Sequence, residues 1–160
     1  MLSYATVAEA DEYHNARQTA AQWDDYTPAQ KQQRLVSASD LIDRLFTYKG
    51  KPENDAQARA FPRFLPQEVP HGALFRRLPE YGAERQAVLP ESVKQACCEL
   101  ALLSDISGSL KNAAKVQNLG GVLVKAGDCK GDDKDWSLAI FAAQRLLLPL
   151  IDRRSFMERG

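Results

Sequence analysis

The sequence lacks any excess of charge and any long apolar run. Lysine plus arginine and aspartate plus glutamate number 21 each, so the 160-residue chain has a formal net charge of zero. Its overall charge therefore predicts no attraction to nucleic acid or to a membrane surface. The longest apolar run, LLLPLI at 146–151, is far too short to span a bilayer. The first residues, MLSYATVAEADEY, show no secretory signal, which predicts a cytoplasmic compartment.

Groups that could carry out catalysis or hold a cofactor are also scarce. The two histidines, His14 and His71, have no motif around them, and the three cysteines include no C-x-x-C pair. Gly120 and Gly121 lack the spacing and the lysine of a phosphate-binding loop. In the acidic stretch 128–135 the glycine comes too early for a calcium loop, and no glutamate closes the ligand set. We therefore predict that the protein is not an enzyme and binds no metal and no cofactor.

What the sequence does contain is strong helix signals, and two of them lie in its first third. Thr6 and Glu9 form a capping box, and no helix-breaking residue follows before Trp23. Thr27 followed by Pro28 is typical of a second helix start. Apolar residues then recur at helical spacing to about residue 47.

Two further helices are predicted in the second half of the chain. Pro90 opens the third, which is predicted to end at Gly108. From Ala96 to Leu103 this helix is apolar except for a single glutamate, which predicts burial on more than one side. The fourth runs from about Asp135, and Pro149 ends or kinks it.

The segments between these helices complete the predicted fold. A long extended, proline-rich loop occupies about 48–89, and loops of this length tend to be functional or bound to a partner. A short β-like arm is predicted at about 115–127, with glycines around its apolar residues Val122, Leu123 and Val124. The fold class is therefore all-α, a small helical bundle with about four main helices. It is predicted to form a single domain over 1–160.

The long loop contains an unusual segment, AQARAFPRFLPQEVP at 56–70. Its three prolines exclude a helix. Arg59, Phe61, Arg63 and Phe64 interleave basic and aromatic side chains, as single-strand-binding proteins do to combine stacking with phosphate contacts. The same residues suit packing, with the rings in a groove between helices and the arginines paired to acidic side chains. Packing is favoured, because no nucleic-acid-binding fold signature accompanies the segment.

Six segments occur in a characteristic order: ATVAEADEYHNAR, LVSASDLIDRLF, YKGKPENDAQARAFPR, LPESVKQACCELAL, GGVLVKAG and AQRLLLPLI. With them the chain resembles the head–tail connector (adaptor, or head-completion) proteins of tailed bacteriophages. The resemblance is to a branch often labelled DnaT-like single-stranded-DNA-binding proteins. Its most specific parts are the stretch from Gly50 to Arg63 and the proline-opened third helix. Members of that branch often carry tryptophan where Phe61 stands, which leaves the packing interpretation intact.

The resemblance implies a structural virion protein located at the head–tail junction and assembled in the cytoplasm of the bacterial host. Such subunits form a homo-oligomeric ring, usually a dodecamer, below the portal protein. The ring extends the channel through which double-stranded DNA passes without specific binding, and it offers a platform to a tail or stopper (head-closure) protein. No membrane partner and no cofactor are implied. The alternative, which the label of the branch favours, is a DnaT-like single-stranded-DNA-binding accessory protein.

The resemblance also implies roles for particular residues. Connectors dock their C-terminal segment on the portal, and Pro149 lets the chain leave the bundle, so 152–160 is predicted to be extended. The candidates for portal contact are Arg153, Arg154, Phe156 and Met157. The candidates for loop anchoring and contact between subunits are Phe61, Arg63 and Phe64. The inter-subunit candidates of the arm are Val122, Leu123 and Val124.

Overall fold

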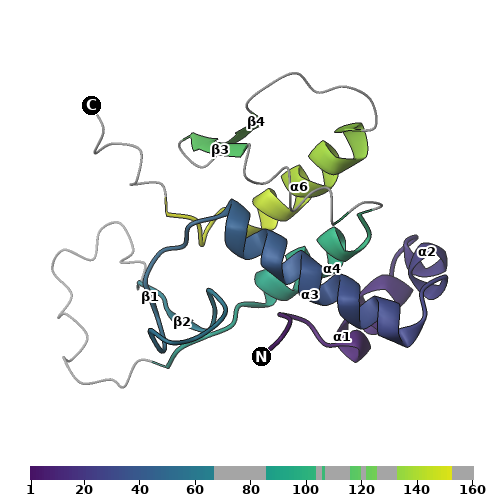
Figure 1. The fold of residues 1–160 in the computed structure, drawn as a ribbon, viewed down its shortest axis with the longest axis horizontal. Helices are drawn as coiled ribbons and strands as arrows, with labels where there is room; N and C mark the ends of the chain where they lie inside the picture. The colour runs from purple at the N-terminus through teal and green to yellow at the C-terminus, as the bar shows by residue number, and fades with distance from the viewer. Residues whose placement is uncertain (67–85, 104–105, 107–115, 120–121, 126–132, 153–160) are drawn as a thin grey trace, which may run out of the picture.

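The computed structural model describes residues 1–66, 86–103, 106, 116–119, 122–125 and 133–152. Within these residues the defined elements are five helices and four short strands (Figure 1). In chain order they are α1 (Val7–Asn15), α2 (Ala20–Asp24), α3 (Pro28–Leu45), β1 (Lys51–Pro52), β2 (Arg63–Phe64), α4 (Glu91–Ala101), β3 (Val116–Leu119), β4 (Val122–Lys125) and α6 (Asp133–Leu147). The expectation of a small, mostly helical protein is confirmed. The strands form two separate two-stranded sheets, so the fold is not purely all-α.

Reciprocal caps begin α1 and α3. At α1 the hydroxyl of Thr6 accepts a hydrogen bond from the Glu9 amide at 3.2 Å, and the Glu9 carboxylate accepts one from the Thr6 amide at 2.8 Å. Thr27 and Gln30 repeat this pair at α3, at 3.3 and 2.9 Å, with Pro28 at the first turn. These bonds satisfy amides that no helical carbonyl can reach. Both helices therefore begin where the sequence predicts.

The first predicted helix is wrong in its length, because it is divided in two. Helix α1 ends at Asn15 and α2 starts at Ala20. The imidazole of His14 lies 4.7 Å from the ring of Trp23, and its Nδ1 is 2.9 Å from the hydroxyl of Thr19. This packing needs a turn between the two helices, and it buries both rings. Tertiary contacts decided the break, since no glycine or proline marks it.

Helix α4 forms the centre of the core. It contacts α1, α3 and α6, and its buried residues are Val93, Ala96, Cys97, Cys98, Leu100 and Ala101. The prediction that this helix is buried on more than one side is confirmed. Its predicted end at Gly108 is wrong, since the helix stops at Ala101. Arg34 of α3 donates to the carbonyl oxygens of Ala101 (2.6 Å) and Leu103, which a helix end leaves without partners.

The predicted long loop contains a small sheet. Strands β1 and β2 are antiparallel, with Lys51 opposite Phe64, and Val88 then pairs with Arg63. The turn into β1 requires glycine, because Gly50 has a φ of 78° and a Cβ there would lie 2.1 Å from the Phe64 carbonyl oxygen. The loop is therefore held to its own backbone on both sides of residues 67–85.

The predicted arm is an antiparallel hairpin of β3 and β4. Val116 lies opposite Lys125, and Leu119 lies opposite Val122. Its backbone form as a hairpin arm is confirmed, and contact with a neighbouring subunit remains a prediction.

Helix α6 packs on α4 and ends at Leu147, two residues before the predicted breaker Pro149. The chain that follows returns to the residues after α3. The Lys49 amide donates to the Leu150 carbonyl at 2.9 Å, and the Asp152 amide donates to the Thr47 carbonyl at 2.8 Å. In the described part of the chain, none of the helices has the length and apolar character needed to cross a membrane.

Candidate functional site

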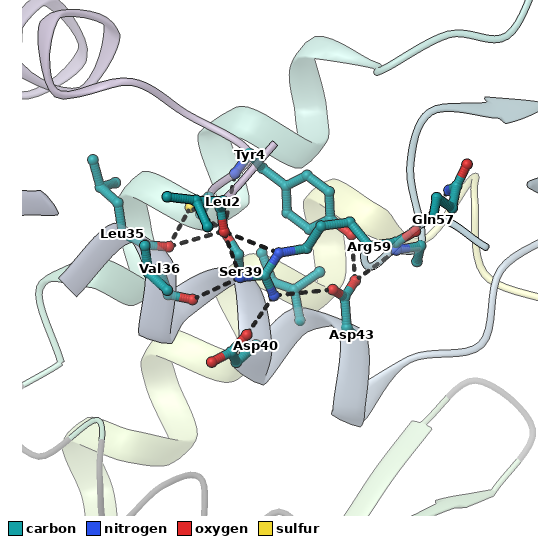
Figure 2. A network of polar contacts seen from close by, with 12 residues as sticks. Leu2, Tyr4, Leu35, Val36, Ser39, Asp40, Asp43, Gln57 and Arg59 are labelled. Atoms are coloured by element: carbon teal, nitrogen blue, oxygen red, sulfur yellow. Dashed lines mark hydrogen bonds and ion pairs between the residues drawn. The ribbon is translucent and has the colours of Figure 1, made fainter. Parts of the chain in front are cut away.

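One face of α3 and one loop arginine form a network of polar contacts (Figure 2). Val36, Asp40 and Asp43 lie on successive turns of α3, because side chains three and four positions apart share a face. Arg59, from the loop between β1 and β2, extends across this face toward the N-terminal segment. Its side chain is 10% exposed.

The guanidinium of Arg59 joins three parts of the chain. Its Nε donates to the Leu2 carbonyl at 3.0 Å, and its Nη1 donates to Asp40 and, at 3.3 Å, to Asp43. Its Nη2 reaches the Val36 carbonyl at 3.5 Å. Burial alone would lower the pKa of Arg59, but the two carboxylates outweigh it and raise that pKa. Arg59 is therefore a charged internal clamp between the N-terminal segment, α3 and the loop.

Tyr4 completes this cluster from the N-terminal side. Its hydroxyl donates to Asp43, and its amide donates to the hydroxyl of Ser39 at 3.0 Å. Burial, reinforced by the neighbouring Asp43 carboxylate, raises the pKa of the Tyr4 phenol. Burial also raises the pKa of Asp43, although the hydrogen bonds from Tyr4 and Arg59 oppose that shift. The polar atoms satisfy one another, which is the arrangement of a structural network.

The two phenylalanines of the unusual segment are used differently from each other. Phe61 is 1% exposed and lies between two tyrosines, with ring centroids 6.0 Å from Tyr4 and 4.8 Å from Tyr48. A cis peptide bond links it to Pro62. Phe64 lies in β2 and is half-buried. Phe61 is thus the anchor of the loop in the core.

Arg63 forms hydrogen bonds with backbone carbonyl groups. Its guanidinium donates to the carbonyl oxygens of Tyr48, Lys49, Gly50 and Ala60. Like Arg59, it therefore holds its own chain together. The contacts of these arginines and of Phe61 favour the packing interpretation of the segment. Their role between subunits remains a prediction.

The other predicted residues are only partly described. Val122, Leu123 and Val124 lie in β4. The candidates for portal contact, Arg153, Arg154, Phe156 and Met157, lie outside the described residues, as do His71, Gly120 and Gly121. Of the predicted extended segment 152–160, Asp152 alone is described, and its amide is bonded to Thr47.

Reactive groups of the described residues are enclosed by the core. Burial raises the pKa of the Cys97 and Cys98 thiols, which disfavours the thiolate. Burial lowers the pKa of His14, whose Nε2 is the one buried side-chain polar atom without a hydrogen-bond partner in the part of the chain that the structure describes. No cluster of metal-ligating side chains occurs among the described residues.

The outer face of α6 is a feature that the sequence reasoning missed. Ile140, Ala143 and Leu147 are buried, whereas Phe141 is 48% exposed and Leu148 is 37% exposed. Ala142 and Arg145 are exposed on the same outer side, and we call Phe141, Ala142, Arg145 and Leu148 the α6 outer face. The apolar residues at 141 and 148, two turns apart, were the available signal. They are on the side where a surface helix usually carries polar residues.

Comparison with known proteins places the chain in one family. A search of curated proteins gave no match, and a search of solved structures gave none either. A family model, in contrast, matches residues 2–157, from the N-terminal segment held by Arg59 to the residues beyond α6. The chain therefore belongs to the family described as "Putative DnaT-like ssDNA binding protein".

Proposed function

We propose that this protein is a structural assembly protein, a head–tail adaptor of a tailed bacteriophage that acts by binding other proteins. The observation that carries this proposal is which basic and aromatic side chains are enclosed by the fold and which are exposed. Arg59, Phe61 and Arg63, the residues best suited to bind nucleic acid, are engaged inside the fold. The α6 outer face instead presents apolar side chains and an arginine, a combination enriched in protein–protein interfaces.

In the proposed role, the subunits form a ring below the portal protein, at the head–tail junction of the virion. The ring extends the DNA channel and provides the platform for a tail or stopper protein. The resemblance of six ordered segments to connectors supports this role. A formal net charge of zero also fits a channel through which DNA must slide, because strong phosphate contacts would hinder its passage.

A second candidate function is single-stranded DNA binding as an accessory protein. The description of the matched family supports this candidate more directly than it supports the adaptor. Stacking requires exposed aromatic rings. Where the structure gives side-chain exposure, Phe141 is the large aromatic residue that is exposed, and Arg145 lies one turn away. In this second function, the α6 outer face would be the described surface that contacts DNA.

Two measurements on the full chain separate the two functions. The first is fluorescence anisotropy of a labelled oligothymidine, titrated with protein over a series of salt concentrations. The second is electron microscopy of the protein mixed with portal rings. We expect weak, unspecific DNA binding and a protein ring attached to the portal. Sub-micromolar affinity at physiological salt, falling steeply as salt increases, together with bare portal rings, would replace the adaptor with the second function.

A truncation tests the predicted role of the C-terminal segment. Deleting 153–160 retains Ile151, which is fully buried, and Asp152, whose amide is bonded to Thr47. We expect an unchanged melting temperature and a loss of portal attachment. Normal attachment of the truncated protein would contradict the assignment of Arg153, Arg154, Phe156 and Met157 to portal contact.

A further inference from the structure

The α6 outer face is exposed although it is built like an interface. Phe141 and Arg145 lie one turn apart in α6, and Leu148 follows the last residue of the helix, three positions beyond Arg145. Phe141 and Leu148 are two of the five exposed large hydrophobic residues in the described part of the chain. Aromatic residues and arginine are enriched in protein–protein interfaces, which makes this side of α6 a candidate contact site.

A hollow elsewhere on the same molecule has the complementary composition. Residues 51–55 and Phe64 surround an open hollow of about 630 Å³. Pro52 and Phe64 are half-buried and supply apolar surface, while Glu53 and Asp55 are exposed carboxylates. Lys51 is the third charged residue of the lining, so the hollow carries one net negative charge.

The hollow is a built feature of the loop. The Glu53 amide donates to the Pro62 carbonyl at 3.2 Å. The Asn54 amide donates to the Gln57 side chain at 3.1 Å, and the Ala56 amide donates to the Asn54 side chain at 2.9 Å. The two carboxylates are therefore presented by a hydrogen-bonded turn, which reduces the entropy lost when a partner binds.

We propose that the α6 outer face of one copy of this chain docks into the hollow at residues 51–55 of a second copy. Arg145 pairs with Glu53 and Asp55, and Phe141 and Leu148 cover Pro52 and Phe64. Opposite charge and matching apolar surface favour this occupant over an unrelated partner. The inference rests on the proposed function in that adaptor subunits assemble with one another.

The two surfaces differ, so the contact is heterologous and can repeat from copy to copy. Figure 1 shows α6 over the middle of the molecule and the β1–β2 corner at its left. The two surfaces share no residue, so one copy presents both of them. A heterologous contact closes into a ring when its rotation allows, and otherwise extends as a filament.

Charge reversal tests the pairing. Sedimentation of the full chain over a concentration series should show association that Arg145→Glu weakens about tenfold or more. The matched control is Arg44→Glu, at an exposed position near the end of α3, which should associate like the parent. Unchanged melting temperatures would show that each variant is folded. Association of Arg145→Glu equal to that of the parent, or a parent that stays monomeric, would overturn the inference.

A mixing experiment identifies the partner surface. The double variant Glu53→Lys with Asp55→Lys should also lose self-association. Mixed with Arg145→Glu, it should regain it, because each variant then meets a complementary surface on the other. Recovery only in the mixture would support the pairing, and no recovery would overturn it. Portal attachment is measured separately, by electron microscopy with portal rings. Attachment without self-association would overturn the contact between copies and leave the adaptor function standing, whereas loss of attachment would count against the adaptor function.

Discussion

The loop residues 59–64 and the outer face of α6 both combine arginine with phenylalanine. In the loop, Arg59 and Phe61 are enclosed, whereas Phe141 and Arg145 on α6 face outward. The difference follows from what surrounds each arginine. Arg59 bonds the Leu2 carbonyl and the carboxylates of Asp40 and Asp43, which the fold brings to the loop. Arg63 bonds carbonyl oxygens of the irregular chain around it, whereas Arg145 lies on the exposed side of α6. A basic–aromatic pattern therefore indicates a binding surface only where the fold offers the arginines no internal partners, whether carboxylates or carbonyl groups.

The largest expected effect is that of replacing the buried loop residue Phe61. Phe61→Ala should lower the free energy of unfolding by ~3–5 kcal/mol, because it leaves a cavity between Tyr4 and Tyr48. Urea unfolding of the full chain measures it. The matched control is Phe141→Ala, which should change stability by less than about 1 kcal/mol. Equal losses in the two variants would remove the distinction between the regions.

The second effect separates the two arginines. Arg59→Ala should cost about 2–3 kcal/mol, since it strips Asp43 of its charged partner. This is below the ~3–5 kcal/mol of a fully buried pair, because the Asp40 side chain is 41% exposed. Arg145→Ala should stay within about 0.5 kcal/mol of the parent. If Arg59→Ala unfolds at the same urea concentration as Arg145→Ala, the clamp contributes nothing to stability.

A third, smaller effect concerns His14, another polar residue that is buried in the protein. Burial lowers its pKa, while Glu99 and Asp11 oppose that shift and Arg17 adds to it. His14 therefore binds a proton more readily in the unfolded chain than in the folded chain. The free energy of unfolding should fall as pH drops below about 6.5.

Urea unfolding between pH 7.5 and 5 measures this loss. His14→Gln should flatten the dependence in that window, with His71→Gln as the control for the other histidine. Carboxylates with lowered pKa, such as Glu9 at about 2, lose their contribution at more acidic pH. A pH dependence that survives in His14→Gln and disappears in His71→Gln would contradict the assignment.

The smallest effect is expected from Leu148, the residue that follows the last residue of α6. Leu147 is fully buried, and Leu148 is 37% exposed. Leu148→Ala should cost less than about 1 kcal/mol, whereas Leu147→Ala should cost ~2–5 kcal/mol through its cavity. Thermal and urea unfolding of the two variants measure the contrast. A reversed order would mean that the outer face of α6 is packed against the protein.

Much of the fold was predictable from local signals. The caps at Thr6 and Thr27, and the stop near Pro149, act within one turn of the chain, so local sequence is enough to place them. The apolar run of α4 predicted its central position, because a helix that is apolar on several sides is buried on more than one of them. The break after Asn15 was not predictable, because it follows from the contact of His14 with Trp23.

The candidate site was harder to predict than the helices. Phe61 was expected to anchor the loop, and it does so between Tyr4 and Tyr48. The packing interpretation predicted acidic partners for the loop arginines. No local pattern identifies Asp40 and Asp43 as the partners of Arg59, because they lie 19 and 16 positions away. The α6 outer face was missed because an apolar residue in a helix does not reveal which side the core will cover.

The sequence alone determined where most helices start and that the protein is mostly helical, because caps, prolines and helical spacing act over a few residues. Its ordered segments also led to the resemblance, and the family match covers almost the same length. Tertiary structure decided which arginines are internal and which apolar residues stay outside. Those outcomes depend on carbonyl groups and carboxylates that distant segments bring together, and short-range patterns carry no information on such distances.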